Sequence, residues 1–175
     1  KSLVLASALG TAGTLVCNER SATRRARLHR VLDERLRAGL RERVTITGHD
    51  AARWALYEPG AYDRVLADVP CSSEQHVLQS AGALAEWSPS RTRRLAGGAY
   101  AIACAALDAV RPGGRVVYAT CALSPQENDD VVARLLERGA RAGQDRPGPE
   151  ARTEQGRRGS AGSERVREVD PGPLV

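Results

Sequence analysis

Short apolar runs alternate with segments of helical periodicity through the first 138 residues of the chain. The runs are rich in Val, Leu and Ile and are bounded by turn-forming residues, which is typical of buried strands. Between the first two runs, apolar residues recur every three or four positions, which predicts a helix capped by Ser21 and stopped by Gly39. The four predicted strands are Thr14–Asn18, Arg43–Thr47, Asp63–Ala67 and Gly114–Thr120.

Two further helices are predicted in the second half of the chain. Ser88-Pro89 is a typical helix start, and the Gly97-Gly98 pair inside that helix is expected to weaken it, because each Gly costs about 1 kcal/mol relative to Ala. Ser124-Pro-Gln-Glu127 has the pattern of a capping box and predicts a helix that runs through Val131, Val132, Leu135 and Leu136. The helix that begins at Ser88 is expected to bury Leu95, Ala99, Ile102, Ala106 and Val110.

Alternation of apolar strands with helices predicts an α/β fold, in which helices cover both faces of a parallel sheet. In such sheets, ligands bind beyond the carboxyl ends of the strands. Three acids and two thiols come after the predicted strands at those ends, so we expect them to gather along one rim. These residues are Glu19, Asp50, Asp68, Cys71 and Cys121.

Each acid at this rim has two interpretations. Glu19 is placed to accept hydrogen bonds from both ribose hydroxyls of a nucleotide-like cofactor, or it is an acid that favours the positive end of the following helix. Asp50 could accept from an exocyclic adenine amine, or it could cap the turn into Ala51–Leu56.

The thiols likewise have two interpretations. Buried cysteines commonly act as small hydrophobic residues, and we leave Cys17 and Cys104 under that interpretation. A thiolate also suits transient addition to an electron-poor carbon, such as carbon 6 of cytosine, which makes carbon 5 able to attack an electrophilic methyl group. In that chemistry Asp68, held by the Val69-Pro70 turn, could hydrogen-bond the pyrimidine edge, and the second cysteine could assist release.

Composition limits the alternatives further. The segment 139–175 is rich in Gly, Pro, Arg and Glu, and we predict that it is a disordered tail after a domain of residues 1–138, whose net charge is +4. That mild excess of basic residues permits a nucleic-acid partner without requiring one.

The four cysteines have no metal-ligand spacing, so no metal is expected. With neither a signal peptide nor a membrane span in the sequence, we expect free thiols in a reducing cytoplasm.

Two motifs resemble those of a known family. Asp68-Val-Pro-Cys-Ser72, together with Tyr118-Ala-Thr-Cys-Ala-Leu-Ser-Pro-Gln-Glu-Asn128, is similar to the Nop/Sun family of RNA (cytosine-5) methyltransferases, and in particular to the bacterial small-subunit ribosomal RNA methyltransferase B type. The Arg111-Pro-Gly-Gly114 turn, Asp50 in its setting and Lys1-Ser2 fit the same family. The resemblance covers about residues 1–138.

The resemblance implies a class I methyltransferase with a Rossmann-like fold, S-adenosylmethionine as cofactor and RNA as substrate. Cys121 would be the nucleophile, and Cys71 would promote release of the methylated RNA. Asp68 would contact both the target base and the methionine end of the cofactor. The remaining cofactor contacts would be Lys1 at the methionine moiety, Glu19 at the ribose, and Asp50 with Ala51 at the adenine.

The chain departs from the family pattern at three places. Glu19 stands where the family commonly has Asp, and Gly97-Gly98-Ala99 replaces longer helix formers. By the same resemblance, the sequence lacks the central strand before the glycine-rich loop, most of that loop, and the closing hairpin. Strands without a neighbour leave backbone groups unpaired, so we expect this chain to fold poorly and to bind the cofactor weakly.

Three hypotheses about function remain. The chain is an RNA cytosine-5 methyltransferase domain, another adenosylmethionine-dependent enzyme with incidental cysteines, or an inactive fragment that retains RNA binding. Ribosomal RNA is favoured over transfer RNA by resemblance alone. The basic cluster Arg91, Arg93 and Arg94 is a better candidate for RNA contact than the stripe on the first helix, which more often is a solvated face. That stripe comprises Arg20, Arg24, Arg25, Arg27 and Arg30.

Overall fold

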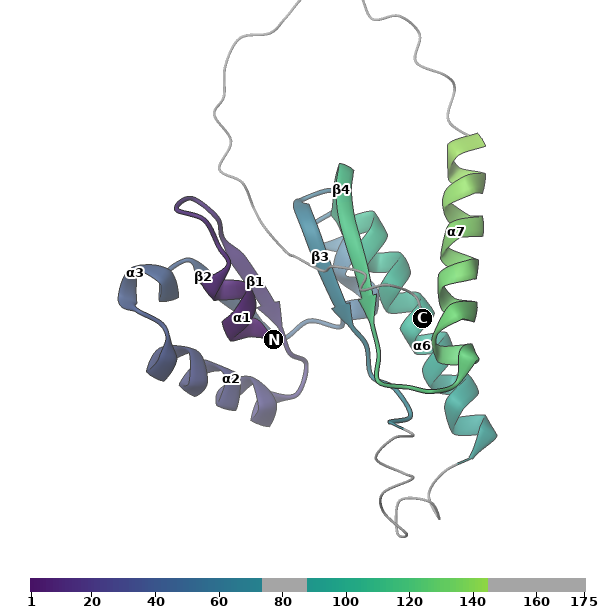
Figure 1. Cartoon of the computed structure of the whole chain (residues 1–175), viewed down its shortest axis with the longest axis horizontal. Helices are drawn as coiled ribbons and strands as arrows, with labels where there is room; N and C mark the ends of the chain where they lie inside the picture. Colours follow the sequence, from purple (N-terminus) through teal and green to yellow (C-terminus); the bar gives the residue numbers. More distant parts are fainter. Residues whose placement is uncertain (74–87, 145–175) are drawn as a thin grey trace, which may run out of the picture.

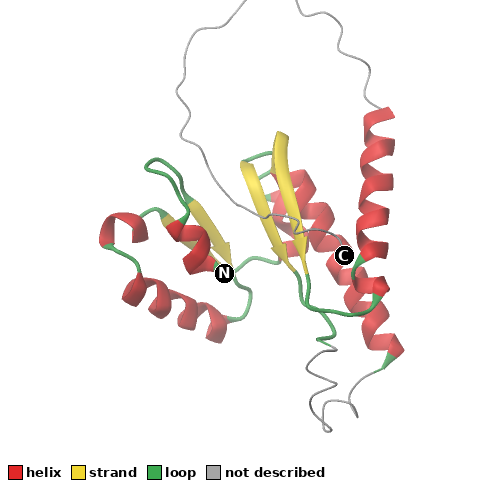
Figure 2. Ribbon diagram, viewed as in Figure 1, coloured by secondary structure: helices red, strands yellow, loops and turns green. Residues whose placement is uncertain are grey.

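The structure is a computed structural model that describes residues 1–73 and 88–144. Strands and helices alternate along these residues, as the hydrophobic pattern predicts (Figure 2). The elements are α1 (Ser2–Ser7), β1 (Leu15–Asn18), α2 (Ala22–Arg35), α3 (Ala38–Arg41), β2 (Val44–Thr47), the 3-10 helix η1 (Ala51–Leu56), β3 (Tyr62–Asp68), α6 (Pro89–Ala109), β4 (Val110–Ala119), the 3-10 helix η2 (Pro125–Glu127) and α7 (Asp129–Gln144).

The four strands form two parallel pairs, which confirms the predicted parallel pairing (Figure 1). β1 pairs with β2 from Leu15↔Val44 to Asn18↔Thr47, and β3 pairs with β4 as far as Asp68↔Ala119. Within the described residues, β1 and β3 are not hydrogen-bonded to each other, so the four strands form two separate sheets. The carboxyl ends of all four strands point the same way in Figure 1.

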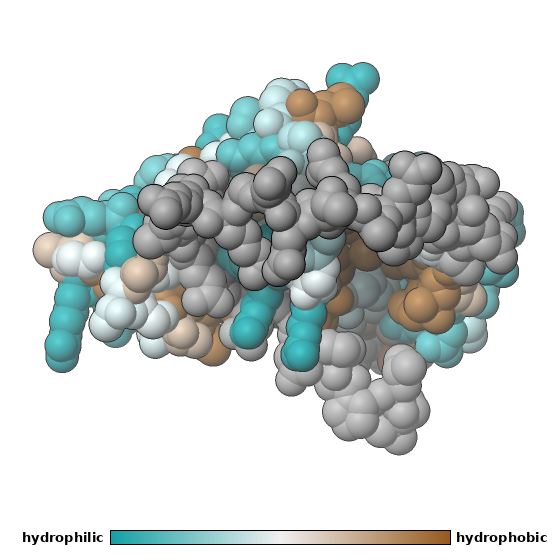
Figure 3. All heavy atoms as spheres, turned by 90° about the horizontal axis from the view of Figure 1, so that it is seen from above, coloured by the Kyte–Doolittle hydropathy of each residue, from teal (hydrophilic) through white to brown (hydrophobic). Residues whose placement is uncertain are grey.

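Each strand pair has its own hydrophobic core. The first core packs β1 and β2 against α1 and α2, with Ala6, Leu15 and Leu32 buried at its centre. The second core packs β3 and β4 against α6, η1 and α7, around Tyr62 and Val131. The large hydrophobic side chains left exposed are scattered over several elements, and Figure 3 shows hydrophobic residues as separate patches on one face.

Small residues bring α6 close to the sheet. The helix begins at Ser88, whose hydroxyl accepts a hydrogen bond from the Arg91 N–H at 3.3 Å, as predicted. Ala99 and Ala106 are buried as expected, but Val110 is the first residue of β4 and not the last of the helix. Gly97 and Gly98 lie on the exposed side of α6, and the helix continues through them. The buried residues of α6 are Thr92, Ala96, Ala99, Ala103, Ala105, Ala106 and Ala109.

The turn before the regular part of β4 depends on two glycines. Gly113 has φ of +80°, a backbone conformation that side chains other than Gly rarely adopt. At Gly114 an added Cβ would lie 2.6 Å from the backbone oxygen of Asp63 on β3. Absence of a side chain therefore lets the two strands approach each other here.

Two predicted boundaries are wrong, and the division into a domain and a tail stays a prediction. α2 ends at Arg35, and Gly39 lies inside the separate helix α3 because Leu36 and Arg37 adopt extended conformations. The predicted capping box is absent: Ser124 makes no side-chain cap bond, because the Glu127 carboxylate turns inward and is buried. The predicted domain boundary at residue 138 falls within α7, which continues to Gln144; the rest of the predicted tail lies outside the described residues.

Candidate active site

A cavity of about 620 Å³ separates β1 from β3. Residues of both strands line it, together with α2, η1 and α6. All five residues that the resemblance assigns to a cofactor lie on its wall: Lys1, Glu19, Asp50, Ala51 and Asp68. The parallel strands explain this convergence, because Glu19 follows β1, Asp50 follows β2 and Asp68 ends β3.

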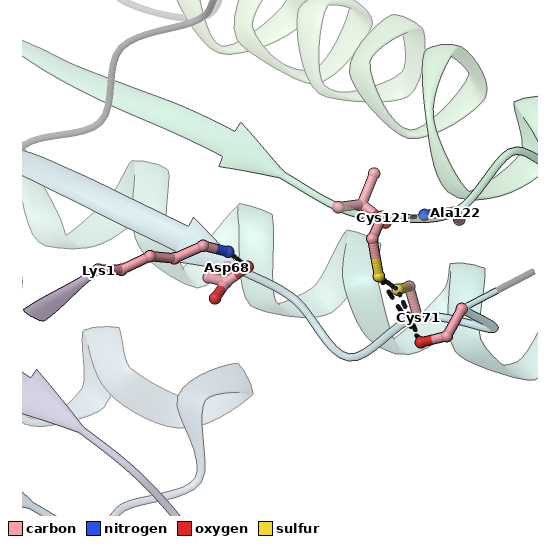
Figure 4. A network of polar contacts seen from close by, with 7 residues as sticks. Lys1, Asp68, Cys71, Cys121 and Ala122 are labelled. Atoms are coloured by element: carbon pink, nitrogen blue, oxygen red, sulfur yellow. Dashed lines mark hydrogen bonds and ion pairs between the residues drawn. The ribbon is translucent and has the colours of Figure 1, made fainter. Parts of the chain in front are cut away.

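Lys1 and Asp68 connect the two sides of the cavity. The Lys1 ammonium lies 2.5 Å from the Asp68 carboxylate, and Figure 4 shows the lysine side chain extended toward the end of β3. Both side chains are about half exposed, so solvent screens this ion pair. The pair places one positive and one negative group at the mouth of the cavity, where each can also meet a ligand.

Glu19 is the acid at the start of α2 that one interpretation predicts, and its role at a ribose stays a prediction. Its carboxylate accepts a hydrogen bond from the Ser21 N–H at 2.8 Å, which places an acid at the start of α2. The same carboxylate lies 3.0 Å from the Arg24 guanidinium, while the side chain faces the cavity. A ribose that binds to Glu19 would therefore meet Arg24 as a competitor for the same oxygens.

Asp50 caps η1, as one of its two interpretations predicts. Its carboxylate accepts from the Ala52 N–H at 3.2 Å, and its second oxygen lies 3.9 Å from Arg20. The adjacent His49 is fixed by Asn18, whose side-chain amide donates to the His49 carbonyl and accepts from the His49 N–H. The ends of β1 and β2 are thus tied together beside the cavity.

Cys71 and Cys121 lie together at the ends of the other strand pair (Figure 4). Their sulfur atoms are 2.8 Å apart, and both are free thiols. The Ser73 hydroxyl lies 3.7 Å from the Cys71 sulfur and 3.6 Å from the Cys121 sulfur. Neither cysteine lines the cavity, but Asp68 and Pro70 do, so the chain passes from the cavity wall to the thiol pair within three residues.

The two thiols have opposite pKa shifts. Burial acts to raise the pKa of Cys71, but hydrogen bonds from Cys121, Ser73 and Thr120 outweigh it and bring the pKa below its usual value. The hydrogen bond to Cys71 raises the pKa of Cys121, against the opposing effect of Ser73. The hydrogen bond between the two sulfurs therefore acts in opposite directions on the two pKa values, lowering that of Cys71 and raising that of Cys121.

Sequence reasoning missed two contributors to this site. Ser73 has φ of +53°, a strained conformation for a residue other than Gly, and this turns its hydroxyl back toward both sulfurs. Arg24 is predicted only as part of a basic stripe, although it contacts Glu19. Two signals in the sequence could have found these residues. Ser73 stands two residues after the Pro-Cys motif, and Arg24 stands five residues after Glu19, near the start of a helix.

The basic residues divide into internal and exposed groups. Arg25 donates to the backbone carbonyls of Glu19 and Arg20, which makes it part of the fold and not of a solvated stripe. Arg93 and Arg94 are exposed at the start of α6.

Across residues 1–73 and 88–144, no three His, Cys, Asp or Glu side chains gather as a metal site would require. Among the helices in these ranges, none is long and apolar enough to cross a bilayer.

The parallel α/β fold of this chain matches two solved structures. The chain aligns with NSun6 from Pyrococcus horikoshii with SFG at a TM-score of 0.65 and 25% identity, covering 79% of this chain and 34% of that one. A second structure, PH0851, shares the fold at a TM-score of 0.63 and 20% identity.

The sequence profile described as "16S rRNA methyltransferase RsmB/F" matches residues 1–165, and the chain belongs to this family of RNA cytosine-5 methyltransferases. It is 38% identical over 138 residues to ribosomal RNA small subunit methyltransferase F of Klebsiella pneumoniae, covering 79% of this chain and 28% of that protein. It is 39% identical over 127 residues to 5-cytosine rRNA methyltransferase NSUN4 of Xenopus tropicalis, covering 70% and 31%. The chain thus spans about a third of the length of these relatives.

Proposed function

We propose that this chain carries the catalytic centre of an S-adenosylmethionine-dependent RNA (cytosine-5) methyltransferase that acts through a covalent cysteine–cytosine intermediate. The observation that carries this proposal is the 2.8 Å contact between the Cys71 and Cys121 sulfurs at the ends of two adjacent strands. Two cysteines that were merely small core residues would be buried, whereas Cys121 is exposed and Cys71 is partly so.

The cavity suits S-adenosylmethionine in size and in chemistry. Its volume of about 620 Å³ lies within the range of small-molecule sites. Glu19 would accept from the ribose hydroxyls, Asp50 with Ala51 would hold the adenine, and Lys1 with Asp68 would contact the methionine end. When bound, the cofactor supplies an electrophilic methyl group.

The thiols and Asp68 act on the cytosine. Cys121 would lose its proton to solvent and form a bond to carbon 6, while Asp68 would hold the pyrimidine edge. Carbon 5 would take the methyl group as the bond between that group and the cofactor's sulfur breaks, which leaves S-adenosylhomocysteine, and the proton on carbon 5 would then pass to the Cys71 sulfur. The electrons of that C–H bond restore the double bond between carbons 5 and 6, and Cys121 leaves as a thiolate. We assign Cys71 the role of assisting this release.

Ribosomal RNA is the proposed substrate, and transfer RNA is the second candidate. Relatives named for each occur among similar proteins, including a mitochondrial tRNA (cytosine(34)-C(5))-methyltransferase of Danio rerio that is 38% identical over 130 residues. Arg93 and Arg94, which are exposed at the start of α6, are our candidates for phosphate contact.

The test is to trap the intermediate. Cys71→Ala is incubated with S-adenosylmethionine and a small-subunit ribosomal RNA transcript, and the products are run on a denaturing gel, with a transfer RNA transcript in parallel. We expect a slowly migrating RNA–protein band that disappears in the Cys71→Ala/Cys121→Ala double variant. Cys104→Ala, a substitution on α6, is the matched control and should accumulate no band.

Three outcomes would overturn the proposal. A band that forms with Cys121→Ala and is lost with Cys71→Ala would exchange the roles of the two thiols. Methylation of RNA without any dependence on either cysteine would identify another adenosylmethionine-dependent chemistry. If every variant binds RNA and cofactor yet neither adduct nor methylated RNA forms, the chain is a non-catalytic module.

A further inference from the structure

Glu127 connects the two loops that carry the thiols. It ends η2, six residues after Cys121, and its side chain is fully buried. One carboxylate oxygen accepts a hydrogen bond from the Ser72 N–H at 2.9 Å. Ser72 directly follows Cys71 and is itself 2% exposed, so this bond joins one cysteine loop to the other within the protein interior.

The loop that carries Cys121 is closed on its own side. The Asn128 side-chain amide donates to the Ala122 carbonyl at 2.7 Å and to the Ser124 carbonyl at 3.2 Å. The Tyr118 hydroxyl donates to the Glu127 carbonyl at 2.6 Å. Burial, with the negative charges of Glu127 and Cys71, raises the pKa of Tyr118 to about 12, so the hydroxyl remains a donor. Glu127 is therefore held firmly by β4 and by its own loop.

A buried carboxylate is an expensive way to satisfy one backbone N–H. A hydroxyl or a carboxamide would serve a structural cap without the desolvation penalty. In the described part of the chain, the other Glu127 oxygen has no hydrogen-bond partner, nor has the Ser72 hydroxyl. The charge-assisted bond to Ser72 is the one polar contact that the carboxylate makes there, and it lies one residue from a thiol.

The bond also orients the next residue of the chain. With the Ser72 N–H anchored, the backbone turns at Ser73 through a left-handed conformation, and the Ser73 hydroxyl comes within 3.7 Å of both sulfurs. Cys71 is thereby confined between Asp68, which pairs with Ala119 at the end of the sheet, and the anchored Ser72.

We propose that Glu127 is a positioning residue that holds the Cys71 thiol against Cys121 by anchoring the Ser72 N–H. This inference rests on the proposed use of the thiol pair in methyl transfer. It predicts that Glu127 governs release of the methylated RNA through Cys71, while attack by Cys121 proceeds without it.

The first test measures thiol geometry without any RNA. The azodicarboxamide oxidant diamide takes two electrons and two protons from the thiols, is reduced to the hydrazine, and leaves a Cys71–Cys121 disulfide that peptide mass spectrometry quantifies. We expect Glu127→Ala to form this disulfide at least about tenfold more slowly, since small displacements of paired groups have effects of that size. Glu127→Gln keeps an oxygen acceptor for Ser72 and should stay close to wild type. Gln126→Ala, an exposed neighbour in η2, is the matched control.

The second test measures release. With both cysteines present, Glu127→Ala should accumulate the RNA adduct that Cys71→Ala accumulates, because attack continues while release is slowed. Glu127→Asp keeps the charge but withdraws the carboxylate by one methylene, and it provides a second variant if the alanine variant is unfolded by circular dichroism. It should show the same slow disulfide formation and the same adduct.

The outcomes separate this inference from the proposed function. Slow disulfide formation in Glu127→Ala or Glu127→Asp without any RNA adduct in Cys71→Ala would support the positioning role and reject the methyltransferase mechanism. Disulfide formation at the wild-type rate in both folded Glu127 variants would overturn the positioning role. So would complete loss of adduct in Cys71→Ala/Glu127→Ala, because Glu127 would then act on Cys121.

Discussion

The Cys71 and Cys121 sulfurs lie 2.8 Å apart although fifty residues separate them in sequence. Asp68 and Ala119 are opposite each other at the ends of β3 and β4, and each cysteine comes two or three residues after its strand. Parallel pairing thus brings the two thiols together, and their contact shifts the two pKa values in opposite directions.

Thiol modification should reveal this distinction. At neutral pH the lowered pKa of Cys71 gives it the larger thiolate fraction, so iodoacetamide should alkylate Cys71 faster than Cys121, although Cys121 is the more exposed. Cys121→Ala removes a hydrogen bond that lowers the Cys71 pKa and should slow alkylation there. Cys71→Ala removes the main cause that raises the Cys121 pKa and should speed alkylation of Cys121. Mass spectrometry over pH 6–9 measures the rates, and the reverse order would contradict the assignment.

Cofactor binding should depend on Glu19 and be limited by Arg24. Glu19→Gln should weaken binding of S-adenosylhomocysteine about tenfold, as expected for loss of hydrogen bonds to a charged group. Arg24→Ala frees the Glu19 oxygens and should leave affinity unchanged or raise it. Isothermal titration calorimetry measures both, with Arg30→Ala on the exposed side of α2 as control. Equal affinity of Glu19→Gln and wild type would place the ribose elsewhere.

Substituting Gly97 and Gly98 should stabilise the protein. At both positions an added Cβ meets no atom within 4 Å, and both lie inside α6, so each change to Ala should raise the free energy of unfolding by about 1 kcal/mol. Ala101→Gly, at an exposed position of the same helix, is the inverse control and should lower it by a similar amount. Urea denaturation measures these differences, and destabilisation by Gly97→Ala would show that its exposed face has a packing role.

The same substitution at Gly114 should have the opposite effect. A Cβ there would lie 2.6 Å from the Asp63 backbone oxygen, so β3 and β4 would have to separate, at a cost of about 1–3 kcal/mol. Gly39→Ala in α3, where the space is open, is the comparison and should be neutral or stabilising. If the melting temperature of Gly114→Ala matches wild type, the strand pair tolerates more movement than its geometry indicates.

Local patterns predicted the strands well, and they predicted that acids gather at one rim. The apolar runs near Leu15, Val44 and Val65 became strands because burial and β-branched side chains favour the same conformation. Gathering of Glu19, Asp50 and Asp68 resulted from parallel topology alone.

What local patterns could not predict depends on distant partners. The Ser-x-x-Glu spacing indicated a cap at Ser124, but Glu127 bonds to Ser72, fifty-five residues away, because an interior N–H there needs an acceptor.

The cavity between β1 and β3 has a consequence for how the molecule unfolds. One hydrophobic core contains Leu15 and Leu32, the other contains Tyr62 and Val131, and the cavity wall draws residues from both sides. Although Val16 of β1 packs against the second core, we expect the two cores to open as separate cooperative units when no ligand is bound. A ligand that contacts Glu19 and Asp68 at once would stabilise both cores together. Saturation of the cavity with that ligand would therefore merge the two unfolding transitions into one. Amide hydrogen exchange in β1 and β2 would then slow together with that in β3 and β4. Occupancy of the small-molecule site would therefore determine whether the two cores unfold together or separately.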